Sequence, residues 1–142
     1  MISHDRVSWQ HWKGNHGVDS GAYQLFLRLE RPAIVVVGAL GSHTFPRGRY
    51  IYTGRASRGL DKRITRHLRK KKRLRWHIDY FVEHAQVEGI RVYPGKATEE
   101  CSINTQTAQA LQGIFPVKGF GSSDCRCISH LMLIPDSQCW DL

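Results

Sequence analysis

Residues 49–69 combine the kinds of side chain that phosphodiester chemistry uses. A short β-prone run contains Tyr50 and Tyr52, ends at Gly54, and is followed directly by Arg55. Tyrosines two residues apart in a strand point to the same side, and a glycine there permits a sharp turn and close approach of a phosphate to the backbone. Cleavage of a phosphodiester needs a base that activates water and a cation that neutralises developing charge, usually with a carboxylate-held metal.

The residues after this run predict a helix over 60–70 that adds further groups to the same region. Its apolar stripe is Leu60, Ile64 and Leu68. Arg63 and His67, also four residues apart, share a second face. Phenol, guanidinium and imidazole groups are thus expected to meet near one strand end. The plainer alternative is that the tyrosines only pack the sheet, since tyrosine favours strands.

The charge of the chain favours a polyanionic partner. Its 142 residues contain 21 Lys and Arg against 12 Asp and Glu, a formal net charge of +9, and nucleic acid is the commonest partner of such an excess. Most of the positive charge lies within 47–75. The run Arg69, Lys70, Lys71, Lys72 and Arg73 is expected to contact phosphates rather than read bases. The alternative is a solvated basic loop with no partner.

The apolar content argues against a membrane protein. Hydrophobic residues make up 41% of the chain, which is ordinary for a globular domain, and no apolar run approaches the ~20 residues that span a bilayer. Residues 1–6 lack the apolar stretch of a secretory signal. These features predict a cytoplasmic protein with no membrane partner.

Hydrophobic periodicity places the motifs on a single small domain. Strands are expected at 22–30, 33–37, 49–53, 89–93 and 128–134, helices at 60–70, 77–84 and 98–111, and loops at 38–48 and 119–124. Thr98 is the expected N-cap of the last helix. Residues 1–20 form a polar, irregular N-terminal extension in which Trp9 and Trp12 are candidate packing anchors. This order predicts an α/β (α+β) fold with a small mixed, mainly antiparallel sheet flanked by helices.

The roles of the four cysteines, and of His77 and Asp79, each have more than one interpretation. Cys125-x-Cys127-x-x-His130 is compatible with zinc, but its spacing is tighter than the usual pair and a second ligand pair is missing. The expectation is therefore reduced thiols that stabilise the core or a loop. His77 and Asp79, two residues apart at a helix start, either orient one another, cap the helix or act in catalysis.

The motif as a whole resembles the core of the GIY-YIG nucleases. The segment 52–56, Tyr-Thr-Gly-Arg-Ala, followed by Leu60, Arg63 and His67, is similar to that family's second motif. Residues 21–23, Gly-Ala-Tyr, look like the GIY half. The stretches 77–80, 100–101 and 119–131 resemble the DUF123 branch of the superfamily. The resemblance covers roughly residues 17–134.

This resemblance implies DNA cleavage assisted by one divalent cation, Mg²⁺ or Mn²⁺, with no tightly bound organic cofactor. Tyr52 matches the proposed general base, Tyr23 the tyrosine that positions water or the base, and Arg63 the arginine that stabilises the transition state. His67 occupies the family's His or Tyr position. A phenol has a pKa near ~10, so neighbouring cations are expected to lower the pKa of Tyr52.

The same resemblance implies a glutamate on a later helix as the metal ligand. Glu100 is the first choice, with Glu99 as the near alternative. The residues expected to contact nucleic acid are Arg55, Arg66, Arg69, Lys70, Lys71, Lys72 and Arg73. Two functions remain open at this point: a DNA endonuclease, with repair or branched or damaged DNA as candidate context, and a non-catalytic nucleic-acid-binding module with the same fold.

Overall fold

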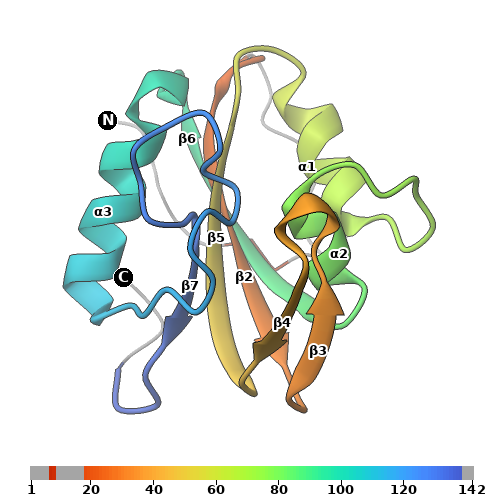
Figure 1. Cartoon of the computed structure of the whole chain (residues 1–142). Coiled ribbons are helices and arrows are strands. Elements are labelled where there is room, and N and C mark those ends of the chain that lie inside the picture. The colour runs from red at the N-terminus through yellow and green to blue at the C-terminus, as the bar shows by residue number, and fades with distance from the viewer. Residues whose placement is uncertain (1–6, 9–17, 139–142) are drawn as a thin grey trace.

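A computed structural model describes residues 7–8 and 18–138, which are organised around one antiparallel sheet (Figure 1). Its strand order is β1-β6-β2-β5-β7. The strands are β1 (Val7–Ser8), β2 (Gly21–Leu29), β5 (Gly48–Ala56), β6 (Gln86–Pro94) and β7 (Leu131–Ile134). A separate two-stranded sheet pairs β3 (Ala33–Val36) with β4 (Ser42–Phe45). Trp9 and Trp12 lie outside the described residues.

Helices cover both faces of the sheet, as Figure 1 shows. The helices α1 (Leu60–Leu68) and α2 (His77–Val82) lie on one side, and α3 (Glu100–Leu111) lies on the other. Short 3₁₀ turns occur at Gly38–Leu40 and Ala97–Glu99. The small helix-flanked sheet confirms the predicted fold class. Within the described residues, no helix has the length and apolar character needed to cross a membrane.

The central strand β2 is buried on both faces, because each face meets a separate helical layer. Leu25 and Leu27 belong to the core beneath α1 and α2, whereas Phe26 packs toward α3 with Leu111. Gln24, a polar residue of this strand, is also fully buried. Its amide donates to Thr107 Oγ1 at 2.8 Å and accepts from the Tyr93 hydroxyl at 3.0 Å, so its polar atoms are satisfied within the protein.

Three local predictions were wrong. Residues 38–48 are not a continuous loop, since they contain a 3₁₀ turn and β4, which pairs with β3. The last strand begins at Leu131 rather than Ile128, because the preceding residues fold back and the N–H of His130 donates to the carbonyl of Phe120. Thr98 is not an N-cap: it lies inside the second 3₁₀ turn, and Glu99 occupies the position before α3 without a side-chain cap.

Gly54 has a different role from the one predicted. The strand does not turn there but continues to Ala56, so Arg55 lies within β5. Gly54 pairs with Tyr23 across the strands. A Cβ atom at position 54 would lie 2.6 Å from the Tyr23 ring and hydroxyl, closer than atoms can approach. Glycine is therefore needed because the Tyr23 side chain crosses directly over the backbone.

Candidate functional site

A cleft of about 320 Å³ brings together groups from both helical layers. Five of the predicted site residues line it: Tyr23 from β2, Tyr52 and Arg55 from β5, Arg63 from α1 and Glu100 from α3. A larger cavity of about 630 Å³ lies between residues 67–74 and 82–87. Because that cavity contains neither a tyrosine nor Glu100, we place the candidate site in the smaller cleft.

Two tyrosines on neighbouring strands form the floor of the cleft. The strands β2 and β5 are antiparallel neighbours, with Leu25 opposite Tyr52 and Tyr23 opposite Gly54. The two tyrosine rings lie 6.4 Å apart between centroids. They therefore occupy the same face of the sheet, which is the arrangement that the two-tyrosine motif predicts.

His67 lies behind the floor, where it contacts Tyr23 rather than the open cleft. Its Nε2 is 2.6 Å from the Tyr23 hydroxyl oxygen. Burial lowers the pKa of His67 to about 3, and the charge of Lys72 adds to this shift, so the imidazole is neutral at physiological pH. Its buried Nδ1 has no partner among the described residues.

The unpaired Nδ1 indicates which tautomer the ring adopts. An unpaired buried N–H costs more than an unpaired acceptor, which favours the proton on Nε2. In that tautomer His67 donates to the oxygen of Tyr23. The phenolic proton of Tyr23 is then available to an acceptor in the cleft.

Arg63 supplies a fixed positive charge on the α1 side. Its guanidinium carbon lies 4.7 Å from the centre of the Trp76 ring, a cation–π arrangement that restricts the side chain. One of its terminal nitrogens donates to the backbone carbonyl of Arg55. Arg63 lines the cleft, where its positive charge is suited to bind an anion.

Arg66 is engaged inside the protein by Asp79. Its two terminal nitrogens contact the two carboxylate oxygens of Asp79 at 2.8 and 2.9 Å. The same carboxylate accepts the backbone N–H groups of Arg75 and Trp76 at 2.8 and 2.9 Å. Asp79 therefore caps α2, one of the three roles left open for it. Burial opposes ionisation, but the hydrogen bonds from Arg66 and the backbone hold the pKa of Asp79 below its ordinary value.

The basic run after α1 divides into two groups. Lys72 is half-buried, and its amine donates to the carbonyls of Arg66 and His67 at 3.1 and 3.0 Å. It thus adds a side-chain donor to carbonyl groups at the C-terminal end of α1. Arg69, Lys70, Lys71 and Arg73 are exposed. Contact of these residues with nucleic acid stays a prediction.

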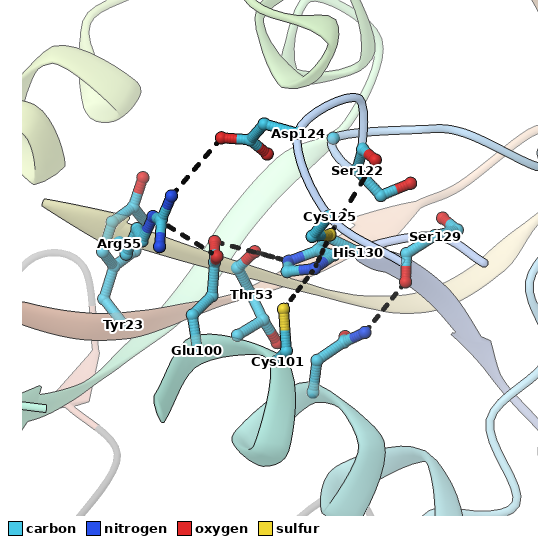
Figure 2. Close-up of polar contacts among 12 residues, drawn as sticks. Tyr23, Thr53, Arg55, Glu100, Cys101, Ser122, Asp124, Cys125, Ser129 and His130 are labelled. Atoms are coloured by element: carbon cyan, nitrogen blue, oxygen red, sulfur yellow. Dashed lines mark hydrogen bonds and ion pairs between the residues drawn. The ribbon is translucent and has the colours of Figure 1, made fainter. Parts of the chain in front are cut away.

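Glu100, like Asp124, is a carboxylate that lines the cleft, and Figure 2 shows both beside Arg55. Its side chain is 12% exposed, with one oxygen 3.7 Å from Arg55 Nε and the other 3.4 Å from His130 Nδ1. The alternative, Glu99, is exposed and lies 3.4 Å from Lys96. A hard divalent cation prefers carboxylate oxygen and keeps several waters. Glu100 at the edge of an open cleft fits such an ion, and its place among the lining residues favours it over Glu99.

The electrostatics around Tyr52 differ from the expectation of a lowered pKa. Burial, reinforced by the negative charge of Glu100, raises the pKa of Tyr52 well above its ordinary value, and Arg63 only partly opposes this. The prediction counted the cations and omitted desolvation, which disfavours the phenolate. A divalent cation held by Glu100 would offset the carboxylate charge.

The sequence did not indicate that Cys101 joins the Cys125-x-Cys127-x-x-His130 segment. One ligand atom from each of these four residues lies within 4.8 Å of the others. His130 is fully buried, and its Nδ1 is 2.9 Å from the carbonyl oxygen of Thr53. Burial lowers the pKa of His130, but the hydrogen bond and charge of Glu100 outweigh it and raise the pKa to about 10.

The fold and these two groups of side chains define a small α+β domain with a tyrosine- and arginine-lined cleft beside a thiol–imidazole cluster. Residues 22–141 match the family model described as "Domain of unknown function DUF123", and the chain belongs to that family. A comparison with curated proteins finds no match, and a comparison with solved structures finds none either.

Proposed function

We propose that this protein is a metal-dependent DNA endonuclease that hydrolyses phosphodiester bonds. The observation that supports this most directly is the convergence of Tyr23, Tyr52, Arg63 and Glu100, from four different elements, on one cleft. A binding module needs positive charge, but it does not need two tyrosines and a carboxylate beside that charge. The resemblance of residues 52–67 to the GIY-YIG motif supports the same reaction.

Each group has a role that its position supports. Glu100 would hold the divalent cation, which would supply positive charge to the phosphate and to the water when bound. Tyr52 takes a proton from the attacking water, and Arg63 binds the phosphate oxygens and stabilises their developing charge. Tyr23, fixed by His67, orients the water or the Tyr52 hydroxyl. Arg55, 3.7 Å from Glu100, keeps the carboxylate aimed at the cleft.

Because the pKa of Tyr52 is raised, this mechanism requires something that favours ionisation of its hydroxyl. Glu100 is the largest charged contribution to that rise. Neutralising the carboxylate with a cation therefore removes part of the barrier to phenolate formation, while the opposing effect of Arg63 persists. Cleavage should thus depend on a metal for two reasons: the metal stabilises charge on the phosphate, and it favours ionisation of Tyr52.

The test is a cleavage assay on linear, flapped, branched and abasic DNA with Mg²⁺, Mn²⁺ or EDTA. We expect metal-dependent cutting of at least one substrate by the parent protein. Tyr50→Phe is the matched control for Tyr52→Phe, because it makes the same change two residues away on the same strand, where the hydroxyl donates to the carbonyl of Pro46. A parent protein that binds these DNAs but cuts none of them would favour the binding module instead.

A further inference from the structure

Three thiols and one imidazole lie close together between the start of α3 and the loop before β7. Figure 2 labels three of these residues, Cys101, Cys125 and His130. We propose that Cys101, Cys125, Cys127 and His130 bind one structural zinc ion. Cys101 lies in the first turn of α3, and the other three residues precede β7. The three cysteines are free thiols, so all three sulfur atoms are available as ligands.

The spacing of the ligand atoms fits tetrahedral zinc. Zn–S bonds of about 2.3 Å and Zn–N bonds of about 2.0–2.1 Å place neighbouring ligand atoms of a tetrahedron about 3.5–3.8 Å apart. The Nε2 atom of His130 lies 3.4 Å from Cys125 Sγ and 3.8 Å from Cys101 Sγ. All four ligand atoms lie within 4.8 Å of one another. Small side-chain adjustments therefore suffice to close the site.

The hydrogen bonds of His130 give a second, independent reason to expect a zinc ion at this cluster. Its Nδ1 lies 2.9 Å from the carbonyl oxygen of Thr53 and 3.4 Å from a carboxylate oxygen of Glu100. Both partners accept, so Nδ1 carries a proton, and Nε2 faces the sulfur atoms of Cys101 and Cys125, where zinc would replace the second proton of the imidazolium. Metal-binding histidines usually donate their other N–H to a carbonyl or a carboxylate in this way.

The chemical type of these four ligands favours zinc over the Mg²⁺ or Mn²⁺ proposed for the cleft. Thiolates and imidazole suit zinc in a tetrahedral S₃N arrangement, whereas Mg²⁺ requires oxygen ligands. The predicted alternative was ordinary core cysteines, which are among the most buried residues. Here all three cysteines are only partly buried, and two of them contact an imidazole nitrogen. The arrangement is that of a binding site rather than of apolar packing.

Zinc at this position would join the loop to the start of α3. The loop and α3 already share a hydrogen bond, in which the amide of Asn104 donates to the carbonyl of Ser129 at 2.8 Å. Cys101 directly follows Glu100, so a metal bond to Cys101 fixes the turn that aims the Glu100 carboxylate. This consequence for Glu100 rests on the proposed function, whereas zinc binding itself does not.

The first test measures zinc in the full-length protein, expressed with added zinc and purified without chelator. We expect about one zinc ion per chain by mass spectrometry of the metal. Three thiols should react with a thiol reagent only after a chelator removes the ion. Reconstitution with Co²⁺ should give the absorption bands of tetrahedral cobalt with thiolate charge transfer. These three readouts use the parent protein and do not depend on any variant folding.

Variants then assign the ligands. Cys127→Ser should weaken zinc binding at least about 100-fold, since losing even a hydrogen bond that orients a ligand costs about 10- to 100-fold. Cys127→His should restore binding, because imidazole also ligates zinc. Arg126→Ala is the matched control: it lies between two of the cysteines and is exposed, and it should keep the parent zinc content.

Several results would overturn the inference. They are a parent protein with only trace zinc, more than one thiol per chain that reacts without chelator (Cys139 is not part of the cluster), a disulfide within the cluster, or a folded Cys127→Ser variant with the parent affinity for zinc. These outcomes are separate from those of the cleavage assay. Zinc binding without DNA cleavage would contradict the proposed function alone. DNA cleavage by a protein that contains no zinc would contradict this inference alone.

Discussion

The two walls of the cleft are held in place by different chemistry. The α1 wall, with Arg63, is fixed by the ion pair between Arg66 and the fully buried Asp79 and by the stacking on Trp76. The α3 wall, with Glu100, begins at the thiol–imidazole cluster that includes Cys101. One wall depends on charge and hydrogen bonds, and the other on sulfur and imidazole.

Because of this difference, we expect the two walls to respond to different solution conditions. A charged pair weakens when its carboxylate is protonated. A thiolate–metal site responds to chelators and oxidants instead. Changes can therefore be directed at the α1 wall, at the α3 wall or at the floor between them, and each should give its own pattern of cleavage, stability and zinc content.

The largest effect is expected from the residue that faces the cleft on the α3 wall. Glu100→Gln should lower metal-dependent cleavage at least about 1,000-fold, since metal stabilisation is worth several kcal/mol and about 1.4 kcal/mol corresponds to tenfold in rate. DNA affinity should stay near the parent value, and zinc should still bind because the carbonyl of Thr53 also accepts from Nδ1 of His130. Glu99→Gln is the control. Loss of cleavage in that variant instead of Glu100→Gln would identify Glu99 as the metal ligand.

The floor and the α1 wall should show the next largest change. Tyr52→Phe and Arg63→Ala should each slow single-turnover cleavage about 100- to 1,000-fold, the usual loss for one group that stabilises a transition state. The affinity of Tyr52→Phe for DNA should be nearly unchanged. Cleavage by Tyr52→Phe at the parent rate would assign the base to another group, with Tyr23 or His67 as the next candidates.

The stability of the α1 wall should depend on Asp79. Asp79→Asn removes the carboxylate charge that pairs with the partly buried Arg66, and breaking such a pair costs about 3 kcal/mol of unfolding free energy. Urea unfolding at pH 7 measures this. Asp136→Asn, at an exposed position, should cost almost nothing. Zinc content should stay at the parent value, because the change affects only the α1 wall.

The same pair predicts the direction of the pH dependence. The pKa of Asp79 is lower in the folded protein than in the unfolded chain, so its stabilising contribution is present above the ordinary Asp pKa of about 3.9 and is lost as pH falls through the folded value. The difference in stability between the parent protein and Asp79→Asn should therefore shrink in acid. A difference that stays constant with pH would contradict a role for this ionisation.

The smallest effect is expected in the exposed part of the basic run after α1. Lys70→Glu with Lys71→Glu should lower DNA affinity for all sequences alike and reduce the slope of log affinity against log salt by about 2, close to one unit for each phosphate contact. Lys72 is left unchanged because it binds carbonyls at the end of α1. An equal charge change at Arg31 and Lys118 is the control. An unchanged slope would place the DNA-binding face elsewhere.

Local patterning predicted most of the secondary structure. The apolar stripe of Leu60 and Ile64 marked α1, and the alternation after Ala22 marked β2, because these signals depend only on the repeat of a helix or a strand. The segment Ser42–Phe45 was missed since its strand character depends on pairing with β3. The boundaries at Thr98 and Ile128 were missed because they are set by long-range contacts.

The sequence by itself determined which residues share the motif of the cleft, because Tyr52, Arg63 and His67 lie close together along the chain and their spacing is local. Only the tertiary structure decided that Arg66 points inward to Asp79, that Gly54 makes room for the Tyr23 ring, and that Cys101 meets the loop before β7. The physical reason is the same in each case. Burial and partners distant in sequence decide whether a polar side chain faces solvent, another residue or a ligand, and no short-range pattern records those partners.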